Sequence, residues 1–241
     1  MKLDDAKKLQ QKKYRQSFGY FLLEGEHLVL ELQKAAETNP HWQQAQLFVT
    51  SAYQDWPGTW PRQLVSERQM AQLADTKTPQ GIVAVAPLPA ATDTAVMAGE
   101  RAVYLHEVQD PGNLGTILRT LAWFGGFRCL LSPGSVDPYN PKVVRASMGA
   151  IFHVPLETEV SLDALSSRYK RIACLDIGGT AITDADFQQY DCYLFGNEAR
   201  GVPADALSAL NVRRFTIPGA ATVESLNLAS AVNMAAYELK R

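Results

Sequence analysis

The sequence has little cysteine and no long apolar run. Its three cysteines lie beside apolar residues without CxxC spacing, at Cys129, Cys174 and Cys192. This pattern favours small buried side chains over a disulfide framework or a zinc site. No segment approaches the ~18–20 consecutive apolar residues that span a bilayer. The N-terminus is polar and basic and does not resemble a signal peptide. These absences predict a cytoplasmic protein.

The sequence also lacks the glycine patterns that bind nucleotides in common α/β folds. No GxGxxG motif lies at a predicted strand–helix junction, which argues against a Rossmann-type NAD or methyltransferase domain. Gly196 and Gly201 have the spacing of a P-loop, but Val202 and Pro203 stand where lysine and serine or threonine are required. ATPase or GTPase activity is therefore not expected.

Net charge gives no sign of a nucleic-acid partner, because 23 basic and 25 acidic residues leave −2. The N-terminus differs from this average. Its basic residues are Lys2, Lys7, Lys8, Lys12, Lys13 and Arg15, against only Asp4 and Asp5. Such a run fits the solvated face of a helix, and equally an arm that follows RNA phosphates. Charge alone leaves both interpretations open.

Apolar runs alternate with helical patterns along the chain. A segment rich in alanine, proline and threonine predicts a linker, 88–99, between a domain at 1–87 and a domain at 100–241. In the first domain, strands are predicted at 20–25, 46–50, 62–66 and 81–86, with helices at 26–36 and 66–74. In the second, strands are predicted at 102–108, 127–132, 152–157, 171–177, 191–196 and 213–218. Its predicted helices are 113–125, 140–148, 161–168, 203–210 and 225–240. This alternation predicts an α/β fold with a parallel sheet, whose ligand loops leave the carboxyl ends of the strands.

Three loops of the second domain collect polar residues and glycines directly after apolar strands. In the first, Asp110 and Asn113 open a helix, and Arg119 follows among apolar neighbours. A helix cap accounts for the loop. Arg119 has two interpretations. Its side chain can extend to solvent or pair with a carboxylate, or its guanidinium can bind a phosphate held near the helix start.

The second and third loops also have ordinary interpretations. In LFGNEARGVP, residues 194–203, a turn with a surface ion pair accounts for Glu198 and Arg200, whereas its two glycines also permit close approach of a ligand. In the third loop, Ile217-Pro218 ends a strand and Ser225-Leu226-Asn227 opens a terminal helix. By itself this is a capped C-terminal helix suited to packing on a partner subunit.

Taken together, the three loops resemble the motifs of the SpoU (TrmH-type) family of SPOUT RNA methyltransferases. The motifs are DPGNLG with Arg119 and Phe124-Gly125, then GNEARGV at 196–202, then Ile217-Pro218 and Ser225-Leu226-Asn227. Residues 137–155 also resemble the family, so the similarity covers 101–241. Residues 12–29 resemble the substrate-binding domain often fused to these enzymes, which is similar to a small RNA-binding ribosomal protein. The chain departs from the family at Gly219 and at Ala221 or Thr222, where methionine and glycine are common.

The resemblance implies an S-adenosyl-L-methionine-dependent RNA methyltransferase that modifies a ribose 2′-hydroxyl without a metal. It implies a deep trefoil knot in the C-terminal domain and a homodimer through that domain, with small residues of the last helix at the interface: Ala229, Ser230, Ala231 and Ala235. The implied cofactor contacts are Gly196, Gly201, Ile217 and Leu226. The implied catalytic residues are Arg119, Asn113, Glu198, Ser225 and Asn227.

Arg119 is expected to clamp the phosphate beside the target ribose, because a guanidinium with a pKa above ~12 is a poor base. Glu198 is the alternative general base. Only RNA carries the 2′-hydroxyl, and the two-domain layout favours ribosomal RNA over tRNA by analogy. The alternatives are a non-catalytic RNA-binding or ribosome-assembly factor on the same scaffold, an enzyme of small nucleotide-like substrates, and a base methyltransferase.

Overall fold

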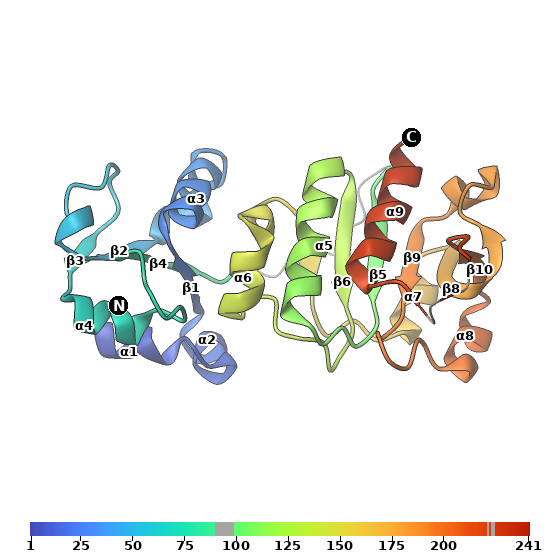
Figure 1. Ribbon diagram of the computed structural model, residues 1–241, viewed down its shortest axis with the longest axis horizontal. Helices are drawn as coiled ribbons and strands as arrows, with labels where there is room; N and C mark the ends of the chain where they lie inside the picture. Colours follow the sequence, from blue (N-terminus) through green and yellow to red (C-terminus); the bar gives the residue numbers. More distant parts are fainter. Residues whose placement is uncertain (90–98, 221, 223–224) are drawn as a thin grey trace. The chain divides into compact units, whose positions relative to one another are not determined.

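The computed structural model describes residues 1–89, 99–220, 222 and 225–241, which form two compact units (Figure 1). One unit consists of Met1–Ala90 and Asp137–His153, and the other of Ala91–Val136 and Val154–Arg241. The predicted α/β fold class is confirmed. The linker predicted at 88–99 lies mostly outside the described residues, and the predicted domain boundaries stay a prediction. No helix in the described ranges is long and apolar enough to cross a membrane.

The N-terminal unit is built on a four-stranded sheet. Its strand order is β1 (Tyr20–Glu24), β4 (Ile82–Pro87), β2 (Gln46–Val49) and β3 (Arg62–Leu64). Strand β4 runs antiparallel to both β1 and β2, while β3 runs parallel to β2. Residues of α1 (Leu3–Lys8) and α4 (Glu67–Leu73) pack with one set of alternate strand residues. Residues of α3 (Glu26–Thr38) pack with the other set, so both faces of the sheet are covered. Between α1 and β1 lies α2 (Lys12–Phe18).

Residues 137–153 complete the core of this N-terminal unit. Helix α6 (Pro141–Ser147) contributes Val144, and the 3-10 turn Ala150–Phe152 contributes Ile151, both buried in the cluster that contains Phe21. An ion pair adds to this packing. The guanidinium of Arg15, only 3% exposed, pairs with Asp137 and also donates to the carbonyl oxygens of Leu9 (2.7 Å) and Gln10 (2.9 Å).

We expect Asp137→Ala to destabilise the N-terminal unit by about 3–5 kcal/mol, because it leaves a buried guanidinium without its counter-ion. Asp4→Ala is the matched control, since it removes the surface Asp4–Lys7 pair, in which Asp4 is 88% exposed, and should cost at most about 1 kcal/mol. Tryptophan fluorescence during urea unfolding measures the effect. Three of the four tryptophans are buried in this unit, whereas Trp123 of the other unit is 84% exposed. Equal midpoints for the two variants would contradict the prediction.

The C-terminal unit contains a six-stranded parallel sheet, as the sequence predicts. Its order is β10 (Arg213–Thr216), β8 (Ile172–Ala181), β9 (Cys192–Phe195), β5 (Arg101–Leu105), β6 (Phe127–Leu131) and β7 (Leu156–Glu157). Helices α5 (Pro111–Phe124) and α9 (Leu228–Lys240) pack side by side in front of the sheet (Figure 1). Helices α7 (Asp163–Arg168) and α8 (Ala204–Leu210) bury Leu165, Leu207 and Leu210 against Tyr104 and Leu194.

Two strands differ from their predicted lengths. The strand predicted at 152–157 is wrong except for Leu156–Glu157, because Ala150–Phe152 forms a 3-10 turn that packs in the N-terminal unit. Strand β8 continues to Ala181, with a register shift against β10 between Arg214 and Phe215. The prediction for the cysteines is confirmed, since all three are free and buried in strands β6, β8 and β9.

A buried group of charges holds the short edge strand β7. Arg128, 3% exposed, pairs with Glu157 of β7 (2.6 Å) and with Glu100 (3.0 Å), and Arg168 of α7 pairs with Glu157 (2.8 Å). Burial alone would raise the pKa of Glu157, but hydrogen bonds from Arg168 and Arg128 outweigh it and lower that pKa. These ion pairs join β6, β7 and α7 where the ladder between the two strands is only two residues long.

Candidate functional site

Three loops leave the same edge of the parallel sheet. Residues 106–110 follow β5, residues 196–203 follow β9, and residues from 217 to 227 follow β10. Because β9 and β5 are adjacent and all the strands are parallel, the loops start at the carboxyl edge, where ligands of open α/β sheets bind.

The side-chain amide of Asn113 joins the three loops. Asp110 caps α5 by accepting a hydrogen bond from the backbone N–H of Asn113 (2.7 Å), which fixes that residue in the first turn. The Nδ2 of Asn113 donates to Oε1 of Glu198 (3.1 Å), and Nδ2 of Asn227 donates to Oδ1 of Asn113 (2.9 Å). Asn227 is itself the cap of α9, because its Oδ1 accepts from the N–H of Ser230 (3.2 Å). Three of the predicted catalytic residues therefore form one hydrogen-bonded chain.

The loop after β9 closes on its own backbone. Asn197 and Gly201 exchange backbone hydrogen bonds of 3.0 and 2.9 Å, and Gly201 adopts a φ of +67°. A Cβ on Gly196 would lie 2.5 Å from the carbonyl carbon of Gly201 and 2.9 Å from the nitrogen of Val202. Only glycine permits this close approach, so both glycines are required by the turn that presents Glu198.

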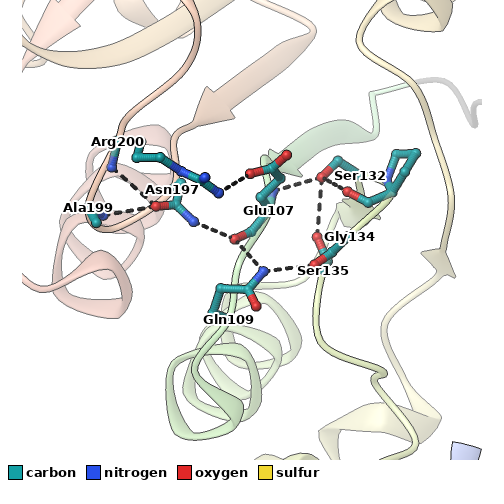
Figure 2. Close-up of polar contacts among 9 residues, drawn as sticks. Glu107, Gln109, Ser132, Gly134, Ser135, Asn197, Ala199 and Arg200 are labelled. Carbon is teal, nitrogen blue, oxygen red and sulfur yellow. Dashed lines mark hydrogen bonds and ion pairs between the residues drawn. The ribbon is translucent and has the colours of Figure 1, made fainter.

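Asn197 and Glu107 form a second connection between the loops (Figure 2). Asn197 is 7% exposed, and its Nδ2 donates to the carbonyl oxygen of Glu107 (2.8 Å) while its Oδ1 accepts from the N–H of Ala199 and of Arg200. Glu107 has a φ of +49°, which is uncommon for a residue other than glycine, and its N–H donates to Oγ of Ser132 (2.7 Å). The strained residue is thus held from both sides.

Arg200 pairs across the loops rather than within its own turn. Its guanidinium lies 2.6 Å from the carboxylate of Glu107, whereas Glu198 accepts from Asn113. Glu198 and Arg200 therefore do not form an ion pair with each other within the turn. Glu198 contacts Asn113 of α5, and Arg200 contacts Glu107 of the loop after β5. Burial lowers the pKa of the neighbouring His106, and the charge of Arg200 acts in the same direction against the opposing effect of Glu107. Both effects favour the neutral form of the His106 imidazole.

The remaining predicted site residues lie on the same segments without joining these contacts. Arg119 is exposed on α5 and forms no hydrogen bond or ion pair with a described residue. Ser225 and Leu226 are exposed immediately before Asn227, and Ile217 is half-buried directly after β10. Within residues 1–89, 99–220, 222 and 225–241, no group of three His, Cys, Asp or Glu side chains is placed to hold a metal ion.

Two residues that shape the loops are missing from the predicted site. Asn197 lies inside the GNE motif, so its position between Gly196 and Glu198 was the available signal. Glu107 has no such signal, because the sequence does not reveal a positive φ at a residue other than glycine.

The chain is similar to known proteins over both units. Residues 100–237 match the SpoU rRNA Methylase family, and residues 2–84 match the MRM3-like substrate binding domain. The 23S rRNA (guanosine(2553)-2′-O)-methyltransferase RlmP of Bacillus subtilis is 31% identical over 99% of this chain and 96% of its own.

Two solved structures extend the similarity. A protein assigned to the TrmH family of RNA methyltransferases from Porphyromonas gingivalis has a TM-score of 0.85 at 30% identity, covering 99% of this chain and 96% of its own. An AdoMet-bound rRNA methyltransferase from Sinorhizobium meliloti has a TM-score of 0.80 at 25% identity, covering 98% of this chain and 93% of its own.

We expect Gly196→Ala to destabilise the C-terminal unit by about 1–3 kcal/mol, because the added methyl group collides with backbone atoms that cannot rotate away. Gly219→Ala is the control, since a Cβ there meets no atom within 4 Å and should change stability by less than about 0.5 kcal/mol. Circular dichroism during thermal unfolding measures both variants. Equal midpoints for Gly196→Ala and the wild type would show that the loop is not packed as described.

Proposed function

Because the chain belongs to the SpoU rRNA methylase family, we propose that it transfers a methyl group from S-adenosyl-L-methionine to a ribose 2′-hydroxyl of ribosomal RNA. The observation that carries the proposal is the hydrogen-bonded chain Glu198–Asn113–Asn227, which joins the three motif-bearing loops. The RlmP relative, named for 2′-O-methylation of 23S rRNA, supports ribose as the acceptor and ribosomal RNA over tRNA.

The loops fit S-adenosyl-L-methionine. At Gly196 the backbone comes too close to Gly201 for any side chain, so peptide groups rather than side chains line that part of the loop. Half-buried Ile217 and Leu226, which is 45% exposed, provide apolar surface for a purine ring. We assign the cofactor contacts to these four residues, and the AdoMet-bound neighbour supports the identity of the cofactor. When bound, the cofactor supplies a methyl group already activated by its sulfonium.

The residues of the chain position the ribose 2′-hydroxyl and accept its proton. The 2′-oxygen forms its bond to the methyl carbon as the sulfur–carbon bond breaks, and the hydroxyl proton leaves. Arg119 is exposed and has no described partner, so its guanidinium is available for the phosphate beside the ribose and stabilises developing negative charge. Asn113 orients Glu198, the carboxylate proposed to accept the proton. Ser225 and Asn227 are proposed to orient the ribose.

The trefoil knot is part of the same proposal. Strand β10 lies at one edge of the sheet, separated from β5 by β8 and β9. Asn227, which follows β10 in sequence, nevertheless contacts Asn113, which follows β5. This contact between residues that follow β10 and β5 supports our proposal that the C-terminal unit has the knotted path implied by the family resemblance.

We expect Arg119→Ala to lower single-turnover methylation by about 100-fold or more, because the developing charge and the adjacent phosphate lose their cation. The measurement uses radiolabelled S-adenosyl-L-methionine with unmodified ribosomal RNA, followed by nucleoside analysis. Arg171→Ala is the matched control, since Arg171 is also an exposed arginine but precedes β8 at the opposite, amino edge of the sheet.

Cofactor affinity should be unchanged in Arg119→Ala when measured by calorimetry, which separates a defect in transfer from misfolding. Near-wild-type transfer by Arg119→Ala would remove Arg119 from the mechanism. Absence of both cofactor binding and methylation in the wild type, with intact ribosomal particles offered as well as free RNA, would favour a non-catalytic RNA-binding factor.

We also propose that the C-terminal unit forms a homodimer through α5 and α9. Ala229 and Ala235 are buried within the chain itself, so a second copy would not reach these two predicted interface residues. The exposed apolar side chains here are Trp123, Met234 and Tyr237, of which Trp123 is 84% and Tyr237 58% exposed. Large exposed apolar side chains on adjacent helices are typical of a subunit interface.

We expect the double variant Trp123→Glu, Tyr237→Glu to sediment as a monomer when the wild type sediments as a dimer, because charges would be buried without partners in the interface. Leu64→Glu, at an exposed position of β3 in the N-terminal unit, should remain dimeric. A monomeric wild type at micromolar concentration, or a dimeric double variant, would contradict this interface.

A further inference from the structure

A cluster of aromatic rings and lysines lies on α1 and α2. The rings of Tyr14 and Phe18 have centroids 5.8 Å apart, and both residues are half-buried. The ammonium of Lys8 lies 6.0 Å from each ring centroid, and that of Lys13 lies 5.7 Å from the Tyr14 centroid. We call Lys8, Lys13, Tyr14 and Phe18 the α2 aromatic face. It combines flat apolar surface with positive charge.

A cavity of about 320 Å³ adjoins this face and shares Phe18 with it. Tyr20 and Val85 provide further apolar lining, and Asp5, Gln44 and Gln46 provide polar groups. The amide of Gln46 is occupied, because it accepts from the amino group of Met1 (2.5 Å) and donates to the carbonyl oxygen of Met1 (3.2 Å). Gln44 is exposed, and its amide forms no hydrogen bond with another described residue.

We propose that the α2 aromatic face and the adjoining cavity bind an unpaired base of the RNA, a site that rests on the proposed function and extends it. Aromatic rings stack on any nucleobase, and proteins that bind single-stranded nucleic acid combine such rings with basic residues that follow the backbone. The free amide of Gln44 can pair with donor and acceptor groups on a base edge. A volume of about 320 Å³ lies at the lower end of the range for small-ligand pockets.

Charge complementarity selects RNA over a protein partner. Lys8 is held over the two rings by an exposed ion pair with Asp5 (2.9 Å), which is a weak contact that a phosphate can replace. Lys13 is exposed on the same helix as the rings. A base stacked on Tyr14 or Phe18 would therefore have its flanking phosphates beside two ammonium groups, whereas an apolar peptide would leave them unpaired.

The test uses the full chain without cofactor and measures fluorescence anisotropy with two labelled RNAs. One is an unstructured oligoribonucleotide, and the other has the same backbone without bases. We expect Tyr14→Ala and Phe18→Leu each to raise the Kd for the first RNA by about tenfold and to leave the Kd for the abasic RNA unchanged. Phe18→Leu keeps apolar volume in the cavity, so its folded state should survive, and tryptophan fluorescence checks this.

Lysine variants test the second half of the proposal. Lys13→Ala should reduce the slope of log Kd against log salt by about 0.7, the amount expected for one lost contact to a single-stranded phosphate. Lys34→Ala is the control, because Lys34 is likewise an exposed lysine on a helix of the N-terminal unit, but it lies on α3 and not on the α2 aromatic face. It should leave the slope unchanged.

Several outcomes would overturn this site. Equal losses of affinity for the two RNAs would show that the rings do not stack on a base. Unchanged affinities in the ring variants, with methylation of ribosomal RNA by the wild type intact, would reject the site and leave the proposed function standing. Binding of a polyglutamate peptide that depends on Lys8 and Lys13, without binding of RNA, would make this a protein-docking face. A wild type that binds neither RNA nor cofactor would reject both proposals.

Discussion

One carboxamide sets the arrangement of the loops in the C-terminal unit. Asn113 donates to Glu198 and accepts from Asn227, so a single side chain connects the loops that follow β5, β9 and β10. A neutral amide is suited to this position because it donates and accepts at once, whereas a carboxylate would only accept and would repel Glu198. Exposed hydrogen bonds contribute little to stability. Asn113 therefore serves mainly to position Glu198 and Asn227.

Backbone constraints make this arrangement possible. The approach of Gly196 to Gly201 and Val202 forms the tight turn that presents Glu198, and Asn197 ties the turn to the carbonyl oxygen of Glu107. Glu107 keeps an unfavourable φ because Ser132, Asn197 and Arg200 all bind it. Strain that persists only when its surroundings fix it is a common property of ligand loops. The parallel sheet brings the three loops to one edge, and the contacts of Asn197 and Glu107 fix the backbone positions of these loops.

Local pattern in the sequence was sufficient for most elements of the fold and for the location of the loops. Apolar runs predicted both sheets, because period and length are encoded within each segment. The local pattern does not determine which segments distant in sequence pack together, or which distant residues pair. The apolar residues of 137–153 could pack on either sheet, and Val144 and Ile151 complete the N-terminal unit. The partner of Arg200 depended on the position of Glu107, which lies ninety-three residues earlier in the chain. The chain Glu198–Asn113–Asn227 followed only once the strand order was known.

The net charge of −2 conceals a separation of charges between interior and surface. Arg128 and Arg15 are both 3% exposed and pair with carboxylates inside the two units. Arg128 holds β7 in this way, and Arg15 holds residues 137–153. The ammonium groups of Lys8 and Lys13 remain at the surface beside the half-buried rings of Tyr14 and Phe18. A phosphate responds to charges within a Debye length of about 8–10 Å and not to the sum over the molecule. A slightly acidic chain is therefore compatible with a local RNA-binding face, and composition was a poor guide to this partner.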